Sequence, residues 1–159
     1  MESHRIWKLG DDIDTDQIIP SQYLLLPNAE EMKPHTLETL KPDFASQAKP
    51  GDVIVAGKNF GCGSSREQAP LVLKALGISA IIAGSFARIF FRNSINIGLP
   101  LIVCQEIHAL VEENQNLDFS LSDGEVVYQG KSYHFPNFPE HIRKIIDSGG
   151  LISYLNASN

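Results

Sequence analysis

The feature that most constrains the fold is an alternation of short apolar runs and amphipathic stretches in the middle of the chain. The apolar runs cover residues 52–57, 80–83 and 101–104. The stretches between them, 64–76 and 85–96, have the spacing of helices; in the first, the apolar residues fall three and four positions apart, as one helix face requires. Strands that alternate with helices predict right-handed crossovers and a parallel sheet. We therefore expect an α/β fold with a central, largely parallel sheet flanked by helices.

The flanking regions add weaker predictions. Residues 5–9 alternate as a strand, and residues 24–50 carry four prolines and predict a plausible mobile loop with one helix near 35–40. Towards the C-terminus the pattern predicts further elements: a helix near 108–113, a hairpin over 119–135 that turns at Gln129-Gly130, and a terminal helix over 139–148. With no linker or repeat, residues 1–159 are expected to form one compact domain.

Composition excludes several classes of protein. Lys and Arg number 13 against 19 Asp and Glu, a net charge of −6, whereas proteins that bind nucleic acid usually carry a basic excess. No stretch has the 18 apolar residues of a membrane span, and the first nine residues lack the apolar core of a secretory signal. We therefore expect a cytoplasmic protein that binds neither nucleic acid nor membrane.

The richest chemistry lies at the turn between the first central strand and the next helix, where residues 58–67 read KNFGCGSSRE. Gly61 and Gly63 allow positive φ angles and close approach of a ligand to the backbone. A helix that starts at Ser64 would offer free N–H groups to a carboxylate, and Arg66 could grip a carboxylate with two hydrogen bonds. The turn therefore predicts an anion site.

The same residues also allow a purely structural interpretation. Ser64 and Glu67 have the S-x-x-E spacing of a capping box, which any helix may use. The turn lacks the G-x-G-x-x-G and P-loop patterns, and it is not G-x-S-x-G because position 67 is Glu. On local pattern alone, capping and catalysis both stay open.

Three segments together resemble a known family. They are residues 14–20 (DTDQIIP), 59–67 (NFGCGSSRE) and 85–93 (SFARIFFRN). In order and spacing they resemble the small subunits of 3-isopropylmalate dehydratases, which match the swivelling fourth domain of aconitase. The resemblance covers residues 5–105, whereas 106–159 match only in length and general pattern. It implies a swivelling β/β/α domain.

The resemblance also implies a function. The family isomerises 2-isopropylmalate and 3-isopropylmalate, hydroxy-dicarboxylates of leucine biosynthesis, by removing water and adding it back. A large partner subunit would carry the [4Fe–4S] cluster, which agrees with the count of only two cysteines, Cys62 and Cys104, in this chain. No cofactor or metal is therefore expected here.

The resemblance assigns roles to particular residues. Ser64 corresponds to the family's catalytic base, Arg66 to a carboxylate ligand, and Ser65 to a supporting hydroxyl or N–H. Asp16 corresponds to an active-site aspartate that would orient the base or a substrate hydroxyl. Cys62, between the two turn glycines, is expected to pack rather than to react.

The loop after the first of these segments is the expected selector of substrate. Relatives that act on tricarboxylates carry Arg at the position of Leu25, so Leu24, Leu25 and Leu26 would shelter a branched alkyl group instead. Alternatively, these leucines simply anchor the loop to the core.

Two further patterns have weaker functional interpretations. Asp12, Asp14 and Asp16 have D-x-D spacing but lack the later residues of a calcium loop. Arg88 and Arg92, one helical turn apart, suggest a second anion clamp, although pairing with carboxylates or a subunit interface is favoured. The competing functions are a related dehydratase, for homocitrate-like, citramalate-like or dimethylmalate-like acids, and a non-catalytic anion-binding module.

Overall fold

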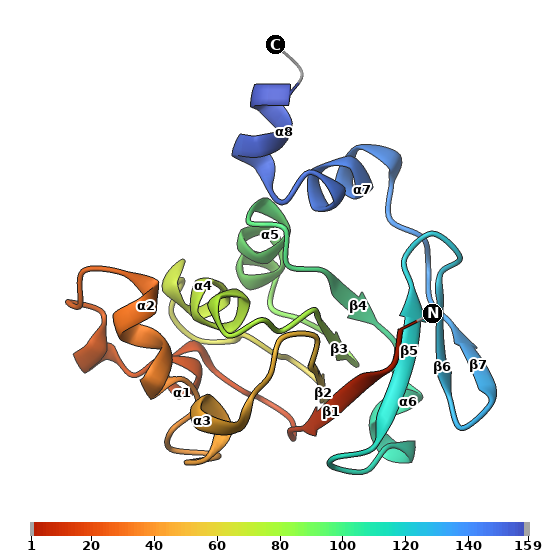
Figure 1. Ribbon diagram of the computed structural model, residues 1–159, viewed down its shortest axis with the longest axis horizontal. Helices are drawn as coiled ribbons and strands as arrows, with labels where there is room; N and C mark the ends of the chain where they lie inside the picture. The colour runs from red at the N-terminus through yellow and green to blue at the C-terminus, as the bar shows by residue number, and fades with distance from the viewer. Residues whose placement is uncertain (1, 158–159) are drawn as a thin grey trace.

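The computed structural model describes residues 2–157, and its centre is one seven-stranded sheet (Figure 1). In spatial order, β4-β3-β2-β1-β5-β6-β7, the first four strands run parallel and the last three join antiparallel. The strand bounds are β1 (His4–Lys8), β2 (Val53–Ala56), β3 (Ala80–Ala83), β4 (Leu101–Val103), β5 (Asn116–Ser120), β6 (Glu125–Tyr128) and β7 (Lys131–His134). The expected α/β class with a largely parallel central sheet is confirmed.

The parallel strands are apolar because both of their faces are covered. All residues of β2 and β3 are buried, as expected of strands sandwiched in an α/β fold. Ile54 and Ala56 point into one core, and Val53 and Val55 point into another on the opposite face.

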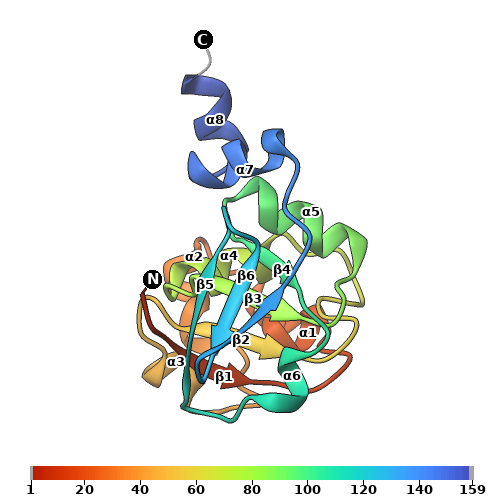
Figure 2. The ribbon, with the colours of Figure 1, turned by 90° about the vertical axis from the view of Figure 1, so that its right-hand side faces the viewer.

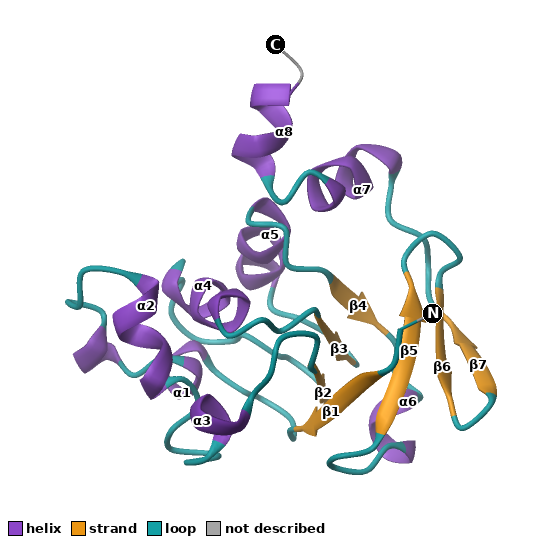
Figure 3. Cartoon of the chain, in the orientation of Figure 1, coloured by secondary structure: helices purple, strands orange, loops and turns teal. Residues whose placement is uncertain are grey.

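Helices cover the first face, and α6 with the antiparallel strands covers the second (Figure 3). On the first face lie α1 (Thr15–Ile18), α2 (Ala29–Met32), α3 (Phe44–Gln47), α4 (Gln68–Ala75) and α5 (Arg88–Asn96). The remaining helices are α6 (Ile107–Leu110), α7 (Glu140–Asp147) and α8 (Leu151–Ala157), and the last two stand at one end of the molecule (Figure 2). Along residues 2–157 no helix combines the length and apolarity needed to cross a membrane.

The predicted helix near residues 35–40 is wrong. A 3₁₀ helix, η2 (Lys33–His35), is followed by turns, and Leu37 has a left-handed backbone with φ of +56°. Tertiary contacts explain this conformation, because the Leu37 side chain is fully buried and its N–H donates to the carbonyl of Ile18 at 2.9 Å. Met32, Leu37 and Phe44 all enter the main core, so the segment packs as part of the domain.

Three other predictions need smaller corrections. The helices predicted from 64 and 85 begin at Gln68 and Arg88. The predicted hairpin is a three-stranded meander, although its turn at Gln129-Gly130 is correct, with φ of 50° and 78°. The helix predicted over 139–148 exists as α7, and α8 was not predicted, because 151–157 is too short to show helical periodicity.

Candidate active site

The loop between β2 and α4 is fastened to the segment that leads into α1. The Gly61 N–H donates to the Ile13 carbonyl at 2.7 Å, and the Thr15 N–H donates to the Cys62 carbonyl at 2.9 Å. The buried Thr15 hydroxyl then donates to the Ser64 carbonyl at 2.7 Å. Two of the segments that carry the family resemblance are therefore held side by side by hydrogen bonds.

Gly61 and Gly63 have positive φ angles of 85° and 90°, as the turn chemistry predicts. At Gly61 there is a second reason for glycine, since a Cβ atom there would overlap the side chain of Phe90 on α5. The turn can therefore lie directly against α5, which brings the third of these segments to the loop.

The capping interpretation of Ser64 is wrong, and so is the expectation that a helix begins there. Helix α4 starts at Gln68, and its N-cap Glu67 makes no side-chain capping bond. Ser64 lies in the loop, exposed, and its hydroxyl has no hydrogen-bond partner among the described residues. Because the fold does not use this hydroxyl, it is free for chemistry.

Arg66 is held along one edge of its guanidinium group. Its Nη1 atom donates to Asp16 Oδ1 at 3.0 Å and to the Ile19 carbonyl at 3.1 Å. The hydrogen bond from Arg66, together with one from the Ser21 N–H, holds the pKa of Asp16 below its usual value. Nε and Nη2 have no partner in the described part of the chain, so this edge remains free for a carboxylate.

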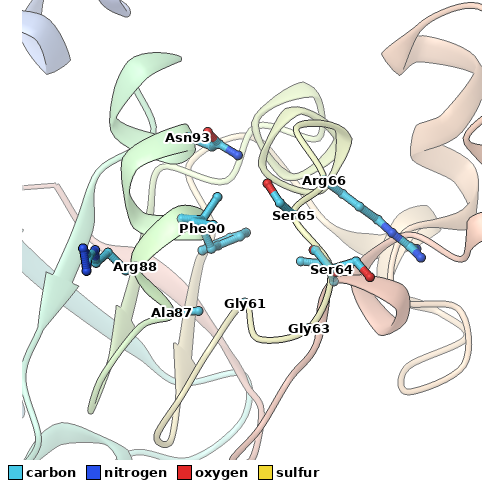
Figure 4. Close-up of a pocket in the computed structure, with 11 residues that line it drawn as sticks. Gly61, Gly63, Ser64, Ser65, Arg66, Ala87, Arg88, Phe90 and Asn93 are labelled. Carbon is cyan, nitrogen blue, oxygen red and sulfur yellow. The ribbon is translucent and has the colours of Figure 1, made fainter.

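A hollow of about 230 Å³ opens beside the loop, between it and α5 (Figure 4). It is smaller than the roughly 300–1,000 Å³ of a complete ligand pocket. Its lining residues are Thr15, Gly61, Gly63, Ser64, Ser65, Arg66, Ala87, Arg88, Ile89, Phe90 and Asn93. The lining includes two arginines and no carboxylate, although the chain as a whole carries a net charge of −6.

The side chains around the hollow point in different directions. In Figure 4 the Ser65 hydroxyl lies on the side of α5, whereas the Arg66 side chain extends away from α5 towards α1. Arg88 is exposed and has no ion-pair partner among residues 2–157, so the structure does not show the carboxylate pairing favoured from sequence. Arg92, one turn further along α5, does not line the hollow.

The predicted selector leucines are not part of this lining. Leu24 and Leu26 pack against the main core, as the anchoring interpretation predicts, whereas Leu25 is 94% exposed. Leu25 is therefore the most exposed of the three leucines, and the role of this loop in substrate selection stays a prediction.

The remaining candidates have structural roles. Asp14 caps α1 in a capping box with Gln17, and Asp12 accepts a hydrogen bond from the Asn59 amide at 3.0 Å. Burial raises the pKa of the Cys62 thiol, and the charges of Asp14 and Asp12 raise it further, which favours the unreactive thiol. In the part of the chain described, no three His, Cys, Asp or Glu side chains are grouped to hold a metal ion.

Sequence reasoning did not single out four residues of the hollow, of which Thr15 and Asn93 are polar and Ala87 and Ile89 are apolar. Thr15 and Asn93 both lie inside the segments that carry the family resemblance. The family resemblance therefore already covered these two residues, but only the fold shows that they face one hollow.

Comparison with known proteins gives consistent matches. Residues 13–106 match the aconitase C-terminal domain family. A 3-isopropylmalate dehydratase small subunit from Lachnospira eligens is 52% identical over 157 residues, which is 99% of this chain and 95% of the relative. An isopropylmalate/citramalate isomerase small subunit from Methanocaldococcus jannaschii is 49% identical, with 95% of this chain and 91% of the relative covered.

A solved structure matches over nearly the whole chain. The crystal structure of a 3-isopropylmalate dehydratase from Methanocaldococcus jannaschii superposes with a TM-score of 0.92 at 41% identity. The alignment covers 98% of this chain and 93% of that one.

Proposed function

The chain belongs to the family of 3-isopropylmalate dehydratase small subunits, within the wider family of aconitase C-terminal domains, and from this premise we propose its part in the reaction. It is the small subunit of a two-chain, cytoplasmic hydro-lyase of leucine biosynthesis. The enzyme interconverts 2-isopropylmalate and 3-isopropylmalate by dehydration and rehydration.

The observation that carries the proposal is the charge of the hollow. A hydroxy-dicarboxylate is an anion, and the lining of the hollow includes Arg66, with an unpaired edge, and no carboxylate, in a chain of net charge −6. Arg66 would bind one carboxylate along its free edge. The Arg88 guanidinium extends away from Arg66 (Figure 4), so a partner for the second carboxylate would have to come from elsewhere in the complete site. The absence of any lining carboxylate removes the repulsion that the rest of the surface would exert.

Ser64 is the proposed base. It would take the proton from the carbon next to the one that loses the hydroxyl, and its own hydroxyl is not engaged by the fold. The hydrogen bond from Thr15 fixes the Ser64 backbone, so the hydroxyl starts from a defined position. Arg66, two residues away, would lower the cost of negative charge on the serine oxygen.

Ser65 and Asp16 have supporting roles. Ser65 faces α5 across the hollow and would donate to the substrate through its hydroxyl or N–H. Asp16 would act through Arg66, because it fixes Nη1 and leaves the opposite edge of the guanidinium turned outward.

The large subunit completes the site. The [4Fe–4S] cluster that it is expected to carry would supply a Lewis acid for the departing hydroxyl. Among the described residues no three His, Cys, Asp or Glu side chains are grouped to hold a metal ion, and the partner is proposed to supply the ligands of the cluster. The partner would also close the hollow, which is open and small on this chain.

Leu25 is the proposed contact for the variable group of the substrate. An exposed apolar side chain favours an alkyl group and provides no charge for a further carboxylate. The named activity of the Methanocaldococcus jannaschii relative makes citramalate a second candidate substrate, with methyl in place of isopropyl.

Reconstitution tests the proposal. The purified chain should be colourless and inactive, and turnover of 2-isopropylmalate should appear when an iron–sulfur large subunit of the family is added. Turnover by this chain without a partner would contradict the two-chain assignment. A stable complex that binds hydroxy-dicarboxylates but never dehydrates them would instead support the non-catalytic module.

A further inference from the structure

Tyr23, just before the loop of Leu24–26, contacts the segment of residues 35–38. Tyr23 ends the 3₁₀ helix η1 (Ser21–Tyr23), and its ring stacks on His35 with centroids 3.7 Å apart and planes at 8°. His35 Nδ1 lies 3.2 Å from Glu38 Oε2, and the interaction of the Glu38 carboxylate with the Tyr23 hydroxyl, more than that with His35, lowers the pKa of Glu38. We call Tyr23, His35 and Glu38 the Tyr23 clasp.

The segment that holds Tyr23 is itself fixed. Leu37 lies between His35 and Glu38, and its left-handed backbone is maintained by a fully buried side chain and by the hydrogen bond to Ile18. Such strained residues persist where the surroundings determine them, often near functional sites. His35 and Glu38 are therefore presented to Tyr23 from a rigid turn.

The other end of η1 is joined to the proposed carboxylate ligand. The Ser21 N–H donates to Asp16 Oδ1 at 3.0 Å, and the same oxygen accepts from Arg66. Arg66 also binds the Ile19 carbonyl, just before η1. The loop of Leu25 thus begins beside the Arg66 guanidinium and continues directly from the clasp.

We propose that Tyr23, His35 and Glu38 are positioning residues that hold Leu25 in register with Arg66 and so set which alkyl group the enzyme accepts. The inference rests on the proposed function, because it requires a hydroxy-dicarboxylate bound at Arg66. The clasp does not touch the substrate. One substrate molecule must place its carboxylate on Arg66 and its alkyl group against Leu25. The clasp affects selectivity because it fixes the position of Leu25 relative to Arg66.

Amide hydrogen exchange on the full chain tests the clasp without any activity. The Leu24 and Leu26 N–H groups donate to Ser21 and Tyr23 carbonyls, so their exchange reports loosening of the loop. Tyr23→Ala should speed their exchange by about three- to tenfold, because this factor corresponds to the stabilising free energy of a stacked aromatic pair. Tyr133→Ala, on β7, is the matched control and should leave both amides unchanged. Unchanged exchange in Tyr23→Ala would overturn the clasp.

Kinetic measurements on the reconstituted holoenzyme test the effect of the Tyr23 clasp on substrate preference. Tyr23→Ala should raise KM for 2-isopropylmalate and reduce its preference over citramalate by about three- to tenfold, with kcat within about twofold. His35→Phe keeps the stack and should retain most of the preference. A loss of kcat with unchanged preference would overturn the positioning role.

Two milder variants keep the test interpretable if Tyr23→Ala does not fold. Tyr23→Phe removes only the hydroxyl and Glu38→Gln only the charge, and both should shift exchange and preference in the same direction by smaller factors. If neither moves either readout, the clasp is overturned. A wild-type holoenzyme that never turns over 2-isopropylmalate would overturn the proposed function instead, whatever the exchange result.

Discussion

At the scale of single residues, Ser64 has a fixed backbone and a free hydroxyl. Thr15 holds its carbonyl at 2.7 Å, and the side chain is exposed without a partner in the described residues. A serine used only for folding would cap the next helix, but α4 begins four residues later. The structure therefore removes the simplest structural explanation for this serine.

Replacing Ser64 with Ala tests the proposed base. Since the hydroxyl makes no hydrogen bond within the described chain, Ser64→Ala should fold and bind the large subunit normally. Loss of the base should lower kcat by about 10²–10⁴-fold in the reconstituted enzyme. Ser122→Ala, on the surface between β5 and β6, is a control that should keep full activity. Turnover close to wild type in Ser64→Ala would exclude it as the base.

Leu25→Arg tests the proposed selector. A cation at this position of the loop should accept an additional carboxylate, so kcat/KM should shift from 2-isopropylmalate towards tricarboxylates such as homocitrate, by about tenfold or more. Leu110→Arg, a half-exposed leucine of α6, adds the same charge elsewhere and should leave the ratio unchanged. An equal shift in both variants would show an effect of net charge rather than of the loop.

At the scale of elements, both helices beside the hollow begin three or four residues later than the sequence pattern predicts. The backbone of residues 85–87, which would start α5, is paired instead with Phe60 in extended conformation. Phe60 N–H donates to the Ser85 carbonyl at 3.0 Å, and Ala87 N–H donates to the Phe60 carbonyl at 2.9 Å. Residues 64–67 form a bend and a turn before α4, so Ser64 and Arg66 lie in the loop that lines the hollow beside α5.

Gly61→Ala tests how tightly the turn and α5 are joined. The new methyl group meets Phe90 and the backbone has a positive φ, so unfolding free energy should fall by about 2–4 kcal/mol. Gly10→Ala is the matched control, because its Cβ would meet nothing within 4 Å. Urea denaturation of both variants measures the difference. Equal stability of the two variants would mean that α5 shifts freely away from the turn.

At the scale of the whole molecule, Asp52 joins the N-terminal strand to the rest of the sheet. Its Oδ2 atom accepts from Arg5 at 2.8 Å, from the Trp7 indole at 2.9 Å and from the Lys49 N–H at 2.9 Å. Burial opposes the charge of Asp52, but the hydrogen bonds from Arg5, Lys49 and Trp7 outweigh it and lower the pKa of the carboxyl.

This pKa shift predicts a pH dependence of stability. A carboxyl whose pKa is lower in the folded protein stabilises it fully above the unfolded value of about 4, and the contribution is lost as the pH falls through the folded value. Asp52→Asn should therefore cost about 2 kcal/mol at pH 7 and clearly less near pH 3. Urea unfolding at both pH values, with the exposed Asp43→Asn as control, measures it. An equal cost at both pH values would exclude this linkage.

The sequence by itself determined the α/β class, the parallel strands and the turn glycines, because these depend on local periodicity and backbone freedom. Apolar runs buried on both faces can only be central strands, and Gly61 and Gly63 are required by positive φ. The segments that carry the family resemblance also contain every residue that lines the hollow, including Ser64 and Arg66.

Only the tertiary structure decided how those residues are used. The left-handed Leu37, the late starts of α4 and α5, and the division of the leucines into two anchors and one exposed side chain all depend on contacts between distant segments. Arg88 joins Arg66 at one hollow, and Tyr23 meets His35 and Glu38, for the same reason. Local pattern has no access to such contacts, because they form only when the sheet brings its loops to one edge.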